Sequence, residues 1–143
     1  MIPAALIAIA ATLTAQAPDE FVAIRCDGTE KFMPAGTRTE STKPVHLTFI
    51  LNEHDRSVSR WNEELSREEP MCAFEMQKCF VDFGPVLITI DSDLEAPSSI
   101  AATIDRRAGT YHSFVTHPAA HTSTLAECVQ TALPKFDPAT RKF

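Results

Sequence analysis

Three histidines lie close together near the end of the chain and are the first candidates for a site. His112, His117 and His121 occur within the segment HSFVTHPAAH. Imidazole nitrogens bind zinc and copper well, and a strand that runs into a loop can bring such rings together. However, no Cys or Glu accompanies them at zinc-motif spacing, and Pro118 restricts how the loop can fold. The pattern favours solvated histidines and no metal site, with a metal binder as the alternative.

The acidic segment DSDLE at residues 91–95 has carboxylates at alternate positions, as in the first half of a calcium-binding loop. The remainder of that loop does not match. Its sixth position, which requires Gly for a sharp turn, is Ala96, and its twelfth, which requires a bidentate Glu, is Ala102. We therefore expect an exposed acidic loop rather than a calcium site.

Residue types that occur in catalytic sites are present, but no sequence motif places them together. Ser99, Asp105 and His112 are the types of a hydrolytic triad, but no G-x-S-x-G turn positions a nucleophile. Paired carboxylates for glycoside hydrolysis could come from one acidic segment, which contains Glu63, Glu64, Glu68 and Glu69. Such a charge run is more simply a solvated face. No C-x-x-C redox pair is present. We expect a non-enzymatic protein with no catalytic residue and no cofactor.

The four cysteines are Cys26, Cys72, Cys79 and Cys128. An even number behind an export signal is typical of disulfides, and three pairings are possible. Spacing favours a local Cys72–Cys79 loop and a Cys26–Cys128 clasp between the two ends of the domain. Chain entropy assigns about 2.5 kcal/mol to the short loop and about 4.7 kcal/mol to the long one. The alternative, a zinc site, lacks any C-x2-C pair.

The export signal is the segment MIPAALIAIAATLTAQA at residues 1–17. It is uncharged, too short to cross a bilayer as a helix, and ends in the Ala15-Gln16-Ala17 pattern that signal peptidase cleaves. It has no Lys or Arg, so either the start amine suffices or the start lies upstream. The alternative is a buried N-terminal helix. We expect a periplasmic or secreted protein in which residues 18–143 form a single domain.

Charge limits the partners of this domain. The formal net charge is −6, and the basic residues are scattered, with Arg106-Arg107 the only pair in mid-chain. An acidic surface repels nucleic acid and anionic lipid headgroups. No second segment is long and apolar enough to span a membrane. We expect an envelope protein or a small ligand as the partner.

The elements that must position these residues show period-two alternation typical of strands. Strands are predicted at residues 21–26, 45–51, 57–61, 80–83, 86–90, 100–105, 110–116 and 125–131. The run 86–90 is expected to be buried on both faces. Gly109 is expected to have a positive φ in a hairpin turn between 100–105 and 110–116. Trp61 and Tyr111 are the only residues of their kinds and mark either packing positions or a binding face.

The connections are predicted from polar and turn-forming residues. Asp27-Gly28 is expected to end the first strand, and loops are expected at 33–43, 91–99 and 117–122. The segment 62–69 is a short helix or a loop, with Asn62 as the N-cap and Pro70 as the stop. The fold class is therefore all-β: a small antiparallel barrel or sandwich, stapled by disulfides, with at most one short helix.

Two segments together resemble a family. Cys26-Asp27-Gly28-Thr29 matches C-x-G-T, and residues 104–111 match I-[DN]-R-x-x-G-x-Y. With the mid-chain Cys pair, the late Cys and the terminal Lys-Phe, they resemble small uncharacterised exported proteins of Alphaproteobacteria. The resemblance covers most of residues 18–143. It implies a periplasmic address and brings no activity.

A second likeness is to bacterial periplasmic lysozyme inhibitors, which are small β-barrels with a disulfide between early and late parts of the chain. It rests on the aromatic strands and the expected Cys26–Cys128 clasp, and the inhibitory loop motif of that family is not found here. The sequence thus indicates a non-enzymatic binding or structural module of the cell envelope. The alternatives are an inhibitor of an envelope-targeting enzyme such as lysozyme and the metal binder above.

Overall fold

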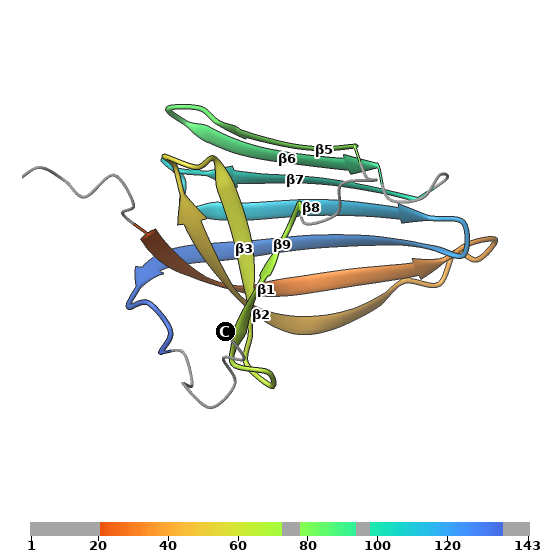
Figure 1. The fold of residues 1–143 in the computed structure, drawn as a ribbon. Coiled ribbons are helices and arrows are strands. Elements are labelled where there is room, and N and C mark those ends of the chain that lie inside the picture. Colours follow the sequence, from red (N-terminus) through yellow and green to blue (C-terminus); the bar gives the residue numbers. More distant parts are fainter. Residues whose placement is uncertain (1–20, 73–77, 94–97, 136–143) are drawn as a thin grey trace, which may run out of the picture.

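The computed structural model describes residues 21–72, 78–93 and 98–135. They form one antiparallel sheet of nine strands, and no helix occurs in these ranges. The strands are β1 (Phe21–Pro34), β2 (Ser41–Asn52), β3 (Ser57–Asn62), β4 (Arg67–Pro70), β5 (Lys78–Phe83), β6 (Leu87–Asp93), β7 (Ser99–Asp105), β8 (Thr110–His117) and β9 (Ala120–Thr131). Their order in the sheet is β4-β3-β2-β1-β9-β8-β7-β6-β5 (Figure 1). The all-β prediction is confirmed.

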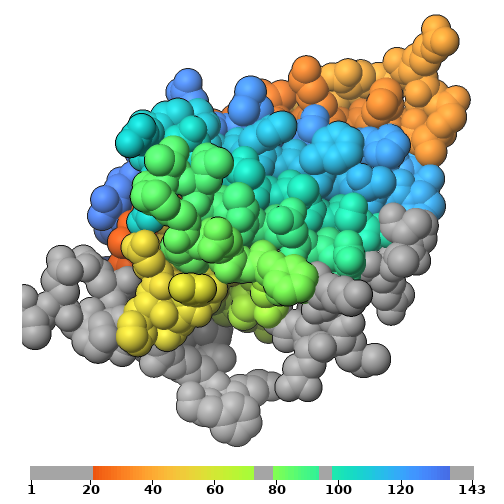
Figure 2. Space-filling model, turned by 90° about the horizontal axis from the view of Figure 1, so that it is seen from above, coloured from red at the N-terminus to blue at the C-terminus, as the bar shows by residue number. Residues whose placement is uncertain are grey.

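The sheet curls into a half-barrel. β4 and β5 are the two ends of the strand order, yet Cys72, just after β4, is bonded to Cys79 in β5. Figure 1 shows how this happens: β3 runs across the direction of β6 to β9 rather than alongside them. The β2–β3 corner thereby lies against the β5–β6 strands, as the space-filling view shows (Figure 2). Side chains on the inner face are thus enclosed by the protein's own sheet.

Alternation along the strands places the core on the concave face. In β6 every second residue, including Ile88 and Ile90, is buried. In β1, Cys26 is buried and Ile24, two residues earlier, is partly buried and packs against the same cluster. The buried cluster consists of Cys26, Phe49, Val58, Ile88, Ile90, Ala102, Ile104, Tyr111 and Ala126. Tyr111 packs on Phe49 with ring centroids 4.8 Å apart, and burial raises the pKa of its phenol. Tyr111 is therefore a packing residue.

Both disulfides pair as the spacing favoured. Cys26 and Cys128 lie directly opposite each other on the neighbouring strands β1 and β9. Cys72 and Cys79 close the short loop, whose residues 73–77 lie outside the described ranges. No free cysteine remains.

The turn predicted at Asp27-Gly28 is wrong, because β1 continues through it to Pro34. Gly28 lies opposite Ala126 of β9 and Val45 of β2. A Cβ at Gly28 would lie 2.7 Å from the Ala126 Cβ and would collide with the Leu125 carbonyl oxygen. The glycine serves close approach of two strands, not a turn.

Other boundary predictions are also corrected. Of the loop expected at 33–43, only residues 35–40 connect strands, and β9 begins at Ala120 within the expected loop 117–122. β6 alternates in burial instead of being buried on both faces, because its outer face has no covering layer. Residues 91–93, expected in an acidic loop, complete β6; residues 94–97 lie outside the described ranges. These strand ends were predicted wrongly because polar residues were taken to indicate loops, whereas the solvent-facing side of a strand also has polar residues.

The segment 62–69, expected to be a short helix or a loop, is a turn that joins β3 to β4 in a hairpin, together with the strand residues on either side. Asn62 does bind as an N-cap would, because its Oδ1 accepts the Leu65 N–H at 3.0 Å. Asn52 repeats this in the β2–β3 turn, accepting the Asp55 N–H at 3.1 Å. The same Asn hydrogen bond can begin a helix or a turn. Pairing of β3 with β4 in the sheet decides that a hairpin forms here and not a helix.

Candidate functional site

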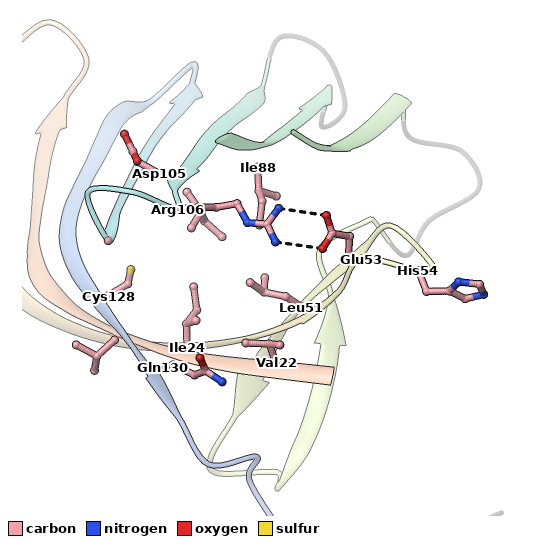
Figure 3. Close-up of a pocket in the computed structure, with 13 residues that line it drawn as sticks. Val22, Ile24, Leu51, Glu53, His54, Ile88, Asp105, Arg106, Cys128 and Gln130 are labelled. Atoms are coloured by element: carbon pink, nitrogen blue, oxygen red, sulfur yellow. Dashed lines mark hydrogen bonds and ion pairs between the residues drawn. The ribbon is translucent and has the colours of Figure 1, made fainter. Parts of the chain in front are cut away.

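A pocket of about 600 Å³ opens at the end of the half-barrel where β1 begins and β9 ends (Figure 3). Its floor is apolar, and its polar residues come from the turns around the opening and from the ends of β7 and β9. The floor consists of Val22, Ile24, Leu51, Ile88 and Ile104, and the polar lining of Glu53, His54, Asp105, Arg106 and Gln130. Ligand sites in proteins commonly combine these two features and lie in the mouths of barrels.

Arg106 links three turns at this opening. Its Nη1 donates to Glu53 Oε1 at 3.1 Å and its Nη2 to Glu53 Oε2 at 3.1 Å, a bidentate pair. Nη1 also donates to the Gly84 carbonyl at 3.0 Å, and the Arg106 backbone N–H donates to Val86 O at 2.7 Å. The guanidinium is thus held above the apolar floor by the β5–β6 connection as well as by Glu53.

The ion pair shifts the titration of both partners. The hydrogen bonds from Arg106 hold the pKa of the Glu53 carboxyl below its usual range, and the same hydrogen bonds raise the pKa of Arg106. The Arg106 side chain is 35% exposed and that of Glu53 62% exposed. The cation is therefore the more enclosed member of the pair.

Asp105, the residue before Arg106, does not bind the guanidinium and instead makes hydrogen bonds within its own turn. Asp105 Oδ1 accepts the backbone N–H groups of Arg107 at 2.9 Å and Ala108 at 2.8 Å, which fixes the β7–β8 turn. Figure 3 shows Asp105 directed away from the Arg106–Glu53 pair, and His54 directed away from the pocket. Gly109 completes this turn with φ +65°, as expected, and its carbonyl accepts the Cys128 N–H at 2.7 Å. The turn that carries Arg106 is thus anchored at the clasp.

Neither a known protein family nor a curated protein matches this chain.

The structure does not bring the three histidines together. His112 and His117 lie five residues apart on β8 and so project from opposite faces of the sheet. His117 Nδ1 accepts the Ala119 N–H at 3.1 Å, and the His121 ring stacks on Phe114 with centroids 6.0 Å apart. In the described part of the chain, no group of three or more His, Cys, Asp or Glu side chains could hold a metal ion.

The residues of the possible hydrolytic triad are also far apart, whereas three of the four glutamates lie around one surface hollow. Ser99 and Asp105 are the first and last residues of β7, and six strand residues span about 20 Å. His112 lies in mid-β8, opposite Thr103. Of the four glutamates, Glu63 and Glu64 are exposed in the β3–β4 turn, and Glu69 accepts a hydrogen bond from Asn62 Nδ2 at 2.8 Å. Glu63, Glu64 and Glu69 line one polar hollow of the surface, in which Glu69 is held by Asn62.

A second hollow, of about 730 Å³, is polar and includes Arg25, His46, Arg60, Trp61 and Glu69. Trp61 is half-buried there, at the rim rather than in the core. His46, which lines this hollow, pairs with Asp27, and its Nδ1 lies 2.6 Å from Asp27 Oδ1. The hydrogen bond with His46 lowers the pKa of the Asp27 carboxyl. This is a surface charge cluster on the outside of β1 and β2.

Sequence reasoning did not find the Glu53–Arg106 pair. The two residues are separated by 53 positions, and each lies in a turn where a charged side chain is ordinary. The available signal was the motif at residues 104–111, in which an Arg follows a buried strand and precedes a glycine turn. That motif drew attention to Arg106 without indicating its partner.

Proposed function

We propose that this protein is a non-enzymatic binding module of the cell envelope, with its ligand site in the pocket at the end of the half-barrel. The observation that carries the proposal is the combination of five apolar side chains beneath a fixed guanidinium in a concavity of about 600 Å³. That volume lies within the range of about 300–1,000 Å³ typical of small-molecule sites.

The proposed location in the cell envelope rests on features other than the pocket. Two disulfides fit a protein of an oxidising compartment. The uncharged apolar segment at residues 1–17, which lies outside the described ranges, has the pattern of an export signal. None of the described residues forms a helix long and apolar enough to cross a membrane. A periplasmic or secreted location accounts for the two disulfides and for the segment at residues 1–17.

Titration with Nile red, a neutral dye whose fluorescence rises in apolar surroundings, tests the ligand site. The wild-type protein is expected to bind it saturably. Val22→Trp fills the pocket from β1 and should weaken binding by about tenfold or more, the equivalent of about 1.4 kcal/mol. Leu125→Trp changes an exposed side chain on the outer face of β9 and should leave binding unchanged. Unsaturable binding, or equal binding by both variants, would contradict the proposal.

A second candidate function is inhibition of an envelope-targeting enzyme such as lysozyme. The observation that favours it is the Cys26–Cys128 clasp, which joins the first and last strands of a half-barrel as in the inhibitors that the chain resembles. The test is lysozyme activity in the presence of excess protein. Full retention of activity would remove this candidate and leave the pocket proposal unaffected.

A further inference from the structure

We propose that the pocket takes an apolar molecule that ends in a carboxylate, and that this carboxylate binds Arg106 in place of Glu53. The inference rests on the proposed function, since it names the chemical class of ligand for the same pocket. It is drawn from three properties of the opening: a fixed cation, a displaceable anion and an apolar floor below them.

The cation stays in place without Glu53. Gly84 accepts a hydrogen bond from Arg106 Nη1 at 3.0 Å, and Val86 accepts one from the Arg106 backbone at 2.7 Å. Both acceptors belong to the β5–β6 connection, not to the turn that carries Glu53. A guanidinium held in this way presents its remaining donors in a planar fork that matches a carboxylate.

The anion is the more easily displaced partner. Glu53 follows the last residue of β2, in a turn, and its side chain is 62% exposed against 35% for Arg106. Its carboxylate can therefore move into water without losing solvation. A ligand carboxylate that replaced it would restore the same two hydrogen bonds, so the exchange changes little in charge or hydrogen bonding.

The apolar part of the ligand supplies the net gain. Ile24, Leu51 and Ile88 lie around the guanidinium in Figure 3 and line the pocket. Each Å² of apolar surface removed from water contributes about 25 cal/mol. Glu53, as part of this protein's own turn, brings no apolar chain into that space.

A cationic ligand fits the opening less well. It would pair with Glu53 and leave the Arg106 guanidinium without its carboxylate, in the enclosed part of the mouth. Asp105 does not compensate, because its carboxylate is used in the β7–β8 turn. The geometry thus selects an anionic headgroup over a cationic one.

The test compares decanoate with decanol, which share an apolar chain and differ in the headgroup. Calorimetry with the full chain, both disulfides oxidised, is run on wild type, Arg106→Gln and Glu53→Gln. Glu53→Gln removes the competitor and should tighten decanoate binding by several-fold or more, while Arg106→Gln should weaken it by about tenfold or more. Decanol binding should stay within about twofold in all three proteins, a change of about 0.4 kcal/mol.

Two matched variants exclude general charge effects. Glu64→Gln removes the same charge from an exposed turn, and Arg107→Gln removes a neighbouring cation of the β7–β8 turn. Neither should change decanoate binding. Far-UV circular dichroism checks that each variant is folded, and if Arg106→Gln does not fold, the tightening by Glu53→Gln alone still decides the matter.

The outcomes separate the two proposals. If decanol and decanoate bind equally in every variant, the pocket is a ligand site and the exchange at Arg106 is wrong. If Glu53→Gln weakens decanoate binding, Glu53 positions Arg106 rather than competing, and the exchange is again wrong. If neither molecule binds the wild-type protein, the ligand site itself is contradicted along with the exchange.

Discussion

Arg106 is the residue at which turns far apart in the sequence meet. Its contacts reach Glu53 between β2 and β3, and Gly84 between β5 and β6. The Arg106–Glu53 ion pair joins the curled corner of the sheet to the strands it covers. An exposed ion pair stabilises a fold only slightly, because water and salt screen it. Under the proposed function, its larger effect is to set which headgroups the pocket accepts.

The depressed pKa of Glu53 predicts how stability depends on pH. Because the folded pKa lies below the ordinary value of 4.5, the pair stabilises the fold above that value, and the contribution is lost as pH falls through the folded pKa. Glu53→Gln should therefore lower the thermal midpoint at neutral pH, and the difference from wild type should shrink below pH 4.5. Thermal melts across this range measure it. A constant difference at all pH values would contradict the ion-pair origin.

Gly28 offers a second prediction at the residue scale. Gly28→Ala places a Cβ against the Leu125 carbonyl and the Ala126 side chain, so β1 and β9 must separate beside the clasp. The free energy of unfolding should fall by about 3 kcal/mol or more. The control is Gly36→Ala, where the added Cβ meets nothing within 4 Å and only the positive φ is unfavourable; there about 1 kcal/mol is expected. Urea unfolding compares the two, and equal losses would contradict the close-approach argument.

At the scale of elements, the β2–β3 and β3–β4 hairpins are built alike. Each begins with an Asn whose side chain accepts the N–H three residues later, and each has a non-glycine residue of positive φ four residues later. These residues are Arg56, at φ 50°, and Ser66, at φ 47°. The repeated turn reverses the chain twice, between β2 and β3 and between β3 and β4.

The strained turn residues predict a stabilising substitution. Ser66→Gly removes the steric cost of a left-handed backbone at a partly exposed site and should raise the free energy of unfolding by up to about 1 kcal/mol. Ser57→Gly, in the neighbouring strand β3, should lower it because glycine is unfavourable there. Urea unfolding of both variants provides the measurement. A loss of stability in Ser66→Gly would show that the hydroxyl matters more than the backbone angle.

The two disulfides should contribute unequally. The clasp closes a separation of 102 residues and the other bond one of 7. Replacing Cys26 and Cys128 by Ala should lower the free energy of unfolding by about 4.7 kcal/mol, and replacing Cys72 and Cys79 by about 2.5 kcal/mol. Denaturant unfolding of both double variants tests this order. A larger loss from the short loop would mean that tying β4 to β5 matters more than chain entropy.

For the whole molecule, the export proposal predicts a definite mass. Protein recovered from a periplasmic extract should begin at Pro18 and be lighter by four hydrogens than the reduced chain, two for each disulfide. Intact mass spectrometry with and without reductant and alkylating agent measures both features. A full-length mass with four alkylatable thiols would contradict the export proposal and the oxidised state together.

Some of this architecture was readable from the sequence. Period-two alternation located all or part of eight strands, and cysteine spacing favoured the two pairings that form. The ends of the strands were harder to predict. Gly28 was misread as a turn because a glycine needed for close strand approach has the same local signature as one needed for a positive φ. Asn62 was misread as a helix cap because the same side-chain hydrogen bond begins helices and turns.

What the sequence determined by itself is what depends on neighbours along the chain: the strand period and the all-β class. The tertiary structure alone decided what depends on distant residues. Only the curl of the sheet brings Glu53 to Arg106 and encloses five apolar side chains beneath them. The physical reason is that a strand pattern states which residues share a face, whereas curvature decides which faces meet.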